Sequence, residues 1–109
     1  MTIIRQGDVT LIRAAALPGG TTERARSEVT LAEGESTGTA HVASGPVVEH
    51  VHDDGLEVRF LEVLAGGGLL THTGPGAHHD TLDVPPGIWE VRVAREQDFY
   101  EGAPRLVAD

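Results

Sequence analysis

Histidine is the residue whose number and spacing in this sequence point to chemistry. The 109 residues contain six histidines and no cysteine. Histidine is the commonest metal ligand among side chains. The lack of cysteine excludes thiolate zinc sites, iron–sulfur clusters, disulfides and cysteine nucleophiles. The chemistry we expect is therefore binding of a divalent metal by imidazole nitrogens, drawn from His41, His50, His52, His72, His78 and His79.

One candidate ligand set is His41, His72 and His79. His72 closes an expected strand, and a Gly-Pro-Gly turn at 74–76 can fold the chain back so that His79 lies beside it. His41 lies on a separate expected strand and is the third candidate. Imidazole suits zinc, nickel and iron alike, so any of these is an expected cofactor. If one coordination position stays open, a bound water becomes a nucleophile for hydrolase or oxygenase chemistry.

A second feature is the pair His50 and His52. Residues two apart in an extended strand leave the same face, which is the spacing by which a sheet supplies two ligands. The other interpretation is that residues 52–55 form a polar hairpin turn, with both rings in solvent. The residues alone leave both interpretations open.

Other functions have less support in the sequence. There is no Gly-x-Ser-x-Gly elbow, and without lysine there is no phosphate-binding Gly-x-x-x-x-Gly-Lys loop. A formal charge of −9 would repel a phosphate backbone, so we expect no nucleic-acid partner. No apolar run is long enough for a membrane span, and no signal peptide is evident. The expectation is a soluble, cytoplasmic protein, and its arginine-only, Ala- and Gly-rich composition is typical of a bacterial genome.

The elements that would position these histidines are short strands. Gly and Pro divide the chain into segments of strand length, rich in Val, Leu, Ile and Thr. The pattern predicts one all-β domain over residues 1–109, an antiparallel sandwich or small barrel. We expect a flexible loop over 17–26, and strands over 8–13, 28–32, 39–43, 47–52, 56–64, 69–72 and 88–96.

Alternation along two of these strands predicts the core. Leu56, Val58, Phe60 and Leu64 fall on one face of the strand over 56–64. In the last strand Trp89, Val91 and Val93 alternate with polar residues. The expected core therefore consists of Val9, Leu11, Val58, Phe60, Leu64, Trp89, Val91 and Val93.

Several segments, in order, resemble a group of small uncharacterised bacterial proteins. The group reads, in outline, Gln-Gly-Asp-Val, then Gly-Glu-x-Thr-Gly-His-Ala-His, then Leu-x-His and Glu-His, then Pro-Pro-Gly. The matching segments here are 5–9, 31–41, 70–72, 84–87 and 105–109. The resemblance implies that His41, His72 and His79 occupy the group's histidine positions, whereas His50, His52 and His78 do not. Thr39 stands where the group has a histidine, which interrupts its His-x-His pair.

A fainter similarity is to the cupins, which are metal-binding β-barrels. Gly45, the pair His50 and His52, Glu57 and the segment 85–87 approximate the two cupin motifs. The spacing after Gly45 is off by one, and Glu90 stands where the second motif has histidine. The similarity implies an all-β barrel.

Three functions remain open at this point. The first is the divalent-metal site described above. The second is a non-catalytic module that self-associates into a homo-oligomer or binds a protein partner, with incidental histidines. The third is a pH-responsive assembly element, because histidines change charge between about pH 5 and 8.

Overall fold

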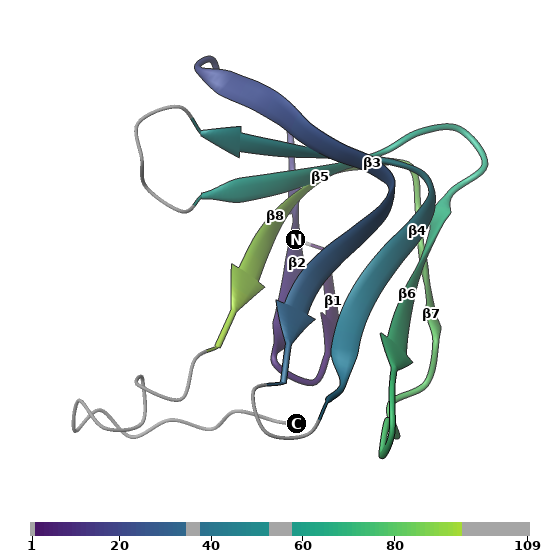
Figure 1. The fold of residues 1–109 in the computed structure, drawn as a ribbon. Helices are drawn as coiled ribbons and strands as arrows, with labels where there is room; N and C mark the ends of the chain where they lie inside the picture. Colours follow the sequence, from purple (N-terminus) through teal and green to yellow (C-terminus); the bar gives the residue numbers. More distant parts are fainter. Residues whose placement is uncertain (1, 35–37, 53–57, 95–109) are drawn as a thin grey trace.

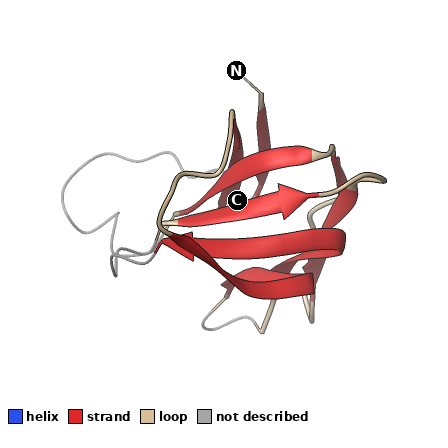
Figure 2. Cartoon of the chain, turned by 90° about the horizontal axis from the view of Figure 1, so that it is seen from above, coloured by secondary structure: helices blue, strands red, loops and turns tan. Residues whose placement is uncertain are grey.

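The structure, a computed structural model, describes residues 2–34, 38–52 and 58–94 (Figure 1). These residues form strands and loops without any helix (Figure 2). Within the described ranges, no helix has the length and apolar character needed to cross a membrane. The strands are β1 (Ile3–Gln6), β2 (Val9–Ala14), β3 (Thr21–Glu33), β4 (Ala40–His52), β5 (Arg59–Val63), β6 (Gly68–Thr73), β7 (Leu82–Val84) and β8 (Gly87–Val93).

All strand pairings are antiparallel, and they join the strands into one curved sheet. The order is β1-β2-β8-β5-β4-β6-β7, with β3 paired to the other edge of β4. Strand β1, at one end of this order, approaches β6 beside the other end, since the Gln6 side chain of β1 hydrogen bonds to the Leu70 carbonyl of β6. The sheet is thus a nearly closed barrel, and the predicted all-β fold class is confirmed.

Strand β4 connects the two halves of this barrel. Its first half pairs with β6 and its second half with β5, and the change of partner falls at Gly45 and Pro46. Gly45 has a φ of 107°, which favours glycine, and proline cannot donate a ladder hydrogen bond. The two strands predicted over 39–43 and 47–52 are therefore the halves of one bent strand.

The prediction of a flexible loop over 17–26 is wrong, because β3 begins at Thr21. This half of β3 pairs with the end of β4, from Thr21 opposite His52 to Arg26 opposite Val48. Its charged Glu and Arg residues carry little strand signal, and the partner strand supplies the order that the local sequence lacks. Strands β1 and β7 were also not predicted, because they are short and stand at the ends of the strand order.

The core fills the inside of the barrel. The predicted core residues Val9, Leu11, Trp89 and Val91 are buried there, Phe60 is buried outside this cluster, and Val93 packs against it. Val58 and Leu64 are 36% and 41% exposed, so their assignment to the core is wrong. Both faces of the predicted strand are apolar, and β5 turns Leu61 and Val63 inward, with Leu61 opposite Trp89.

Parts of several predictions lie outside the described residues. They are residues 53–55 of the hairpin turn, Leu56 and Glu57 of the expected strand over 56–64, Arg95 and Glu96 of the expected last strand, and residues 35–37 and 105–109 of the segments that carry the family resemblance.

Candidate metal centre

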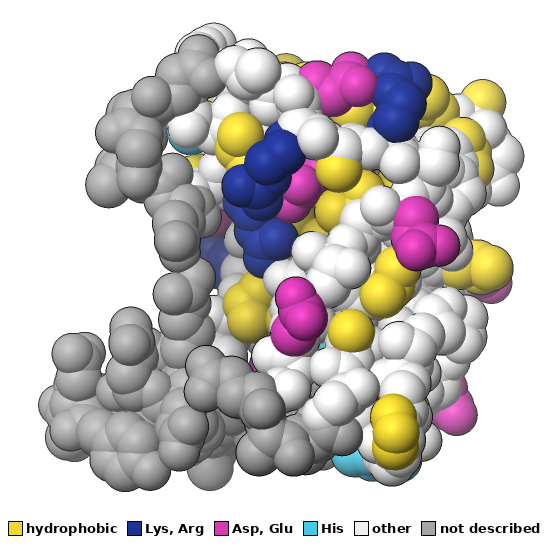
Figure 3. Space-filling model, in the orientation of Figure 1, with side chains coloured by type: hydrophobic (Ala, Val, Ile, Leu, Met, Phe, Trp, Pro, Cys, Tyr) yellow, Lys and Arg dark blue, Asp and Glu magenta, His cyan; other side chains and the backbone are white. Residues whose placement is uncertain are grey.

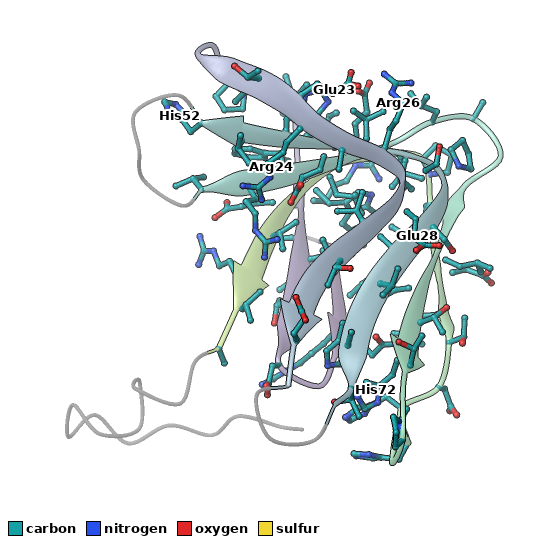
Figure 4. All side chains as sticks on the ribbon, in the orientation of Figure 1. Glu23, Arg24, Arg26, Glu28, His52 and His72 are labelled. Carbon is teal, nitrogen blue, oxygen red and sulfur yellow. The ribbon has the colours of Figure 1, made fainter. Side chains whose placement is uncertain are left out.

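Two of the predicted ligands, His41 and His72, lie directly opposite each other on neighbouring strands. His41 of β4 is the register partner of His72 of β6, so both side chains leave the same face of the sheet. Their rings stack, with centroids 4.5 Å apart and planes inclined by 10°. His41 is buried, with 7% of its surface exposed, while His72 is half-buried at the barrel's lower end (Figure 4).

The turn after β6 brings two more histidines to this pair. The amide of Ala77 hydrogen bonds to the Gly74 carbonyl, which turns the chain back toward β6. The ring of His79 then lies 4.9 Å from that of His72 and 6.0 Å from that of His41. The ring of His78 lies 5.4 Å from that of His72 and 4.2 Å from that of His79. Four imidazoles therefore meet at one end of the barrel.

Donor nitrogens, rather than ring centres, decide what can hold an ion. One nitrogen each of His72, His78 and His79 lies within 4.8 Å of the other two, and among the described residues these three form the group able to hold a metal. His41 is outside that group. A ring nitrogen coordinates an ion that lies in the plane of its ring. Because the stacked rings of His41 and His72 have nearly parallel planes, one ion cannot lie in the planes of both.

Gln6 orients the buried His41. Its amide nitrogen donates to the carbonyls of Leu70 and Asp80, at 2.9 and 2.8 Å, which identifies its other amide atom as the oxygen. That oxygen lies 2.8 Å from Nδ1 of His41 and can only accept a hydrogen bond, so Nδ1 carries the hydrogen and donates it. A neutral His41 therefore carries its lone pair on Nε2. Gln6 is itself only 2% exposed, so this arrangement is held inside the barrel.

His72 has the reverse arrangement. Its Nδ1 accepts hydrogen bonds from the backbone amides of His78 and His79, at 3.1 and 3.3 Å. Nδ1 must carry a lone pair to do so, which places the ring proton of a neutral His72 on Nε2. His78 resembles His41, because its Nδ1 faces the Gly76 carbonyl at 3.3 Å and its lone pair is on Nε2.

The structure thus gathers the three predicted residues His41, His72 and His79 into one cluster, together with His78. Sequence reasoning set His78 aside because it falls outside the family pattern; its position next to His79 after a tight turn was the signal for including it. The sequence also provided no indication that Gln6 contacts this cluster, although Gln6 is the first residue of the Gln-Gly-Asp-Val motif. Which of these residues bind an ion stays a prediction.

His50 and His52 lie at the other end of β4, far from the cluster, and Figure 4 shows His52 and His72 at opposite ends of the barrel. Both are half-buried. Nε2 of His50 lies 3.0 Å from the carboxylate of Glu62 on β5, to which it is a cross-strand neighbour. Neither residue belongs to the metal-capable group found among the described residues.

A buried carboxylate lies at the same end of the barrel as His50. Glu49 is 3% exposed and accepts two hydrogen bonds from Arg24, each 3.0 Å long, and one of 3.2 Å from Arg59. Arg24 is the extra residue of a bulge in β3, which lets its side chain reach Glu49. Burial alone would raise the pKa of Glu49, but the two guanidinium groups outweigh it and hold the pKa below its usual value. Figure 3 shows arginine side chains on the upper half of this face and histidine atoms at its lower edge.

Comparison with known proteins identifies a family without a known function. The family model described as "Domain of unknown function (DUF8820)" matches residues 5–94, and the chain belongs to this family. No curated protein and no solved structure matches the chain. The matched range contains strands β2 to β8, the second half of β1 and all four clustered histidines.

Proposed function

We propose that this member of the DUF8820 family binds one divalent transition-metal ion through His72, His78 and His79. The observation that supports the proposal is the approach of their donor nitrogens to within 4.8 Å of one another. Three imidazole donors without thiolate or carboxylate suit zinc, nickel or iron. The predicted ligand set is thereby modified, with His78 taking the place of His41.

The distances require a modest closure of the cluster. In a tetrahedral site with metal–nitrogen bonds of about 2.0–2.1 Å, ligand nitrogens lie roughly 3.4 Å apart. His78 is exposed and His72 and His79 are half-buried, so rotation of the rings at the protein surface can supply this closure. His41, buried behind His72, forms the inner wall of the site.

Three protein ligands leave at least one coordination position for water or a small ligand. Structural zinc sites usually have four protein ligands, whereas catalytic sites have three and an open position. The proposed site is therefore of the open kind, and bound water there would be polarised by the ion. The proposal assigns metal binding and assigns no reaction.

The metal content of the untagged protein, purified after expression with added zinc, nickel and iron, tests this proposal. We expect close to one equivalent of metal by plasma mass spectrometry. His72→Ala, His78→Ala and His79→Ala should each lower metal affinity at least about tenfold. His50→Ala is the matched control, because this histidine lies at the opposite end of β4, and its metal content should equal that of the wild type.

Two results would overturn the proposal. The first is a wild-type protein with less than about a tenth of an equivalent of metal after this expression. The second is metal content that is unchanged in all three ligand variants.

A further inference from the structure

The ring nitrogen of His72 that carries the lone pair, Nδ1, already serves as a hydrogen-bond acceptor within the fold. Nδ1 accepts the backbone amide hydrogens of His78 and His79, and so holds the turn that presents these two residues. An unprotonated ring nitrogen has one in-plane lone pair. That of Nδ1 in His72 is directed at these two amides. The ring proton of the neutral side chain is then on Nε2.

Coordination by His72 is incompatible with this arrangement. A metal ion bound to Nδ1 would take the position of the two amide hydrogens. A metal ion bound to Nε2 would displace the proton to Nδ1, where it would point at the same two N–H groups. In either case a neutral His72 can bind an ion only after both hydrogen bonds are broken.

We infer that metal binding at this cluster is coupled to a rearrangement of the turn Gly74–His79, so that metal occupancy controls the conformation of this surface turn. This inference rests on the proposed metal site and adds its regulation. In the metal-free state His72 anchors the turn through its side chain, and in the bound state the same side chain is a ligand.

The construction of the turn suits such a change. Gly74 and Gly76 have φ values of 101° and 82°, and within the turn one backbone hydrogen bond joins Ala77 to Gly74. A Cβ added to Gly76 would meet no atom within 4 Å, so the tip of the turn has space around it. By contrast, β6 before the turn is held on both edges, by β4 and β7.

Nuclear magnetic resonance of the ¹⁵N-labelled full chain tests the inference directly. Without metal, we expect the Nε2–H form of His72 and scalar couplings across the hydrogen bonds between its Nδ1 and the amide nitrogens of His78 and His79. One equivalent of Zn²⁺ should abolish both couplings. The amide resonances of the residues that pair β3 with β4 should not change when zinc is added.

Two variants separate anchoring from coordination. His72→Phe removes the acceptor, so hydrogen exchange of the two amides should become about fivefold faster without metal. His78→Ala removes a ligand side chain but keeps its backbone amide, so the metal-free couplings should remain.

The outcomes also separate this inference from the proposed function. Zinc bound at one equivalent with both couplings intact would overturn the inference and leave the metal site standing. No zinc binding at all would overturn the metal site and, with it, the inference. A metal-free His72 in the Nδ1–H form would overturn the inference irrespective of zinc.

Discussion

The ring of His41 stacks on the ring of His72 across two antiparallel strands, with planes only 10° apart. This relationship places both predicted ligands in one cluster and at the same time prevents them from sharing one ion as they stand. The cluster therefore has two parts. His41 is buried and oriented by Gln6, whereas His72, His78 and His79 lie nearer the surface and have donor nitrogens that can approach one another.

The first prediction concerns His41. His41→Phe keeps a flat ring against His72 and removes both ring nitrogens. Because the donor group consists of His72, His78 and His79, this variant should retain the metal stoichiometry of the wild type, measured on untagged protein. Loss of the metal in His41→Phe, with a folded protein by circular dichroism, would restore His41 as a ligand.

The second prediction concerns Gln6. Gln6→Leu removes the donor to the carbonyls of Leu70 and Asp80 and the acceptor for His41 inside the barrel. Leaving buried polar groups without a partner costs about 1–3 kcal/mol each, so the free energy of unfolding in urea should fall by about 2 kcal/mol or more. Arg5→Gln, on the exposed side of the same strand, is the control and should change it little. Equal stability of the two variants would contradict the role of Gln6.

The third prediction concerns Glu49 and pH. The pKa of Glu49 lies below its ordinary value of 4.5, so the ionised form stabilises the folded state. That stabilisation is fully present above about pH 4.5 and is lost as the pH falls through the lower pKa of the folded state. Glu49→Gln should therefore reduce the free energy of unfolding by about 2–3 kcal/mol at pH 7, and by progressively less in acid.

Denaturant unfolding at several pH values between 7 and 3 measures this difference for Glu49. Glu90→Gln is the matched control, because its ion pair with Arg92 is exposed and its loss should change stability much less. A difference between wild type and Glu49→Gln that stays constant over this pH range would show that the charge of Glu49 is not involved.

The fourth prediction compares two glycines of the turn beside the cluster. Both Gly74 and Gly76 have positive φ, so alanine is strained at either position by about 1–2 kcal/mol. At Gly74 the new Cβ would also clash with the backbone carbonyl oxygen of Gly38, whereas at Gly76 it would meet no atom within 4 Å. Gly74→Ala should therefore lower the thermal midpoint clearly more than Gly76→Ala. Equal midpoints would indicate that the contact between Gly74 and Gly38 relaxes without cost.

Local sequence patterns predicted which segments form strands better than they predicted where those strands begin and end. The strand over 69–72 corresponds closely to β6, because its Leu and Thr residues favour a strand and glycines bound the segment on both sides. The sequence predicts a loop over 17–26, because its charged residues give no strand pattern, and only pairing with β4 orders residues 21–26 as a strand. The face of β5 was also assigned incorrectly, because both faces of that segment are apolar and its neighbours decide which one is buried.

The sequence by itself determined that this protein is all-β and that imidazole is its candidate ligand, because composition and the two-residue period act within a few neighbouring residues. Tertiary structure alone decided that His41 meets His72 across 31 positions, that Gln6 holds one of them, and that His78 joins the donor group. The Gly-Pro-Gly sequence at 74–76 signals the turn that brings His79 back to His72, but the strand register that pairs His41 with His72 leaves no trace in the residues that flank them. The direction of a ring's lone pair depends further on hydrogen-bond partners that only the folded chain supplies.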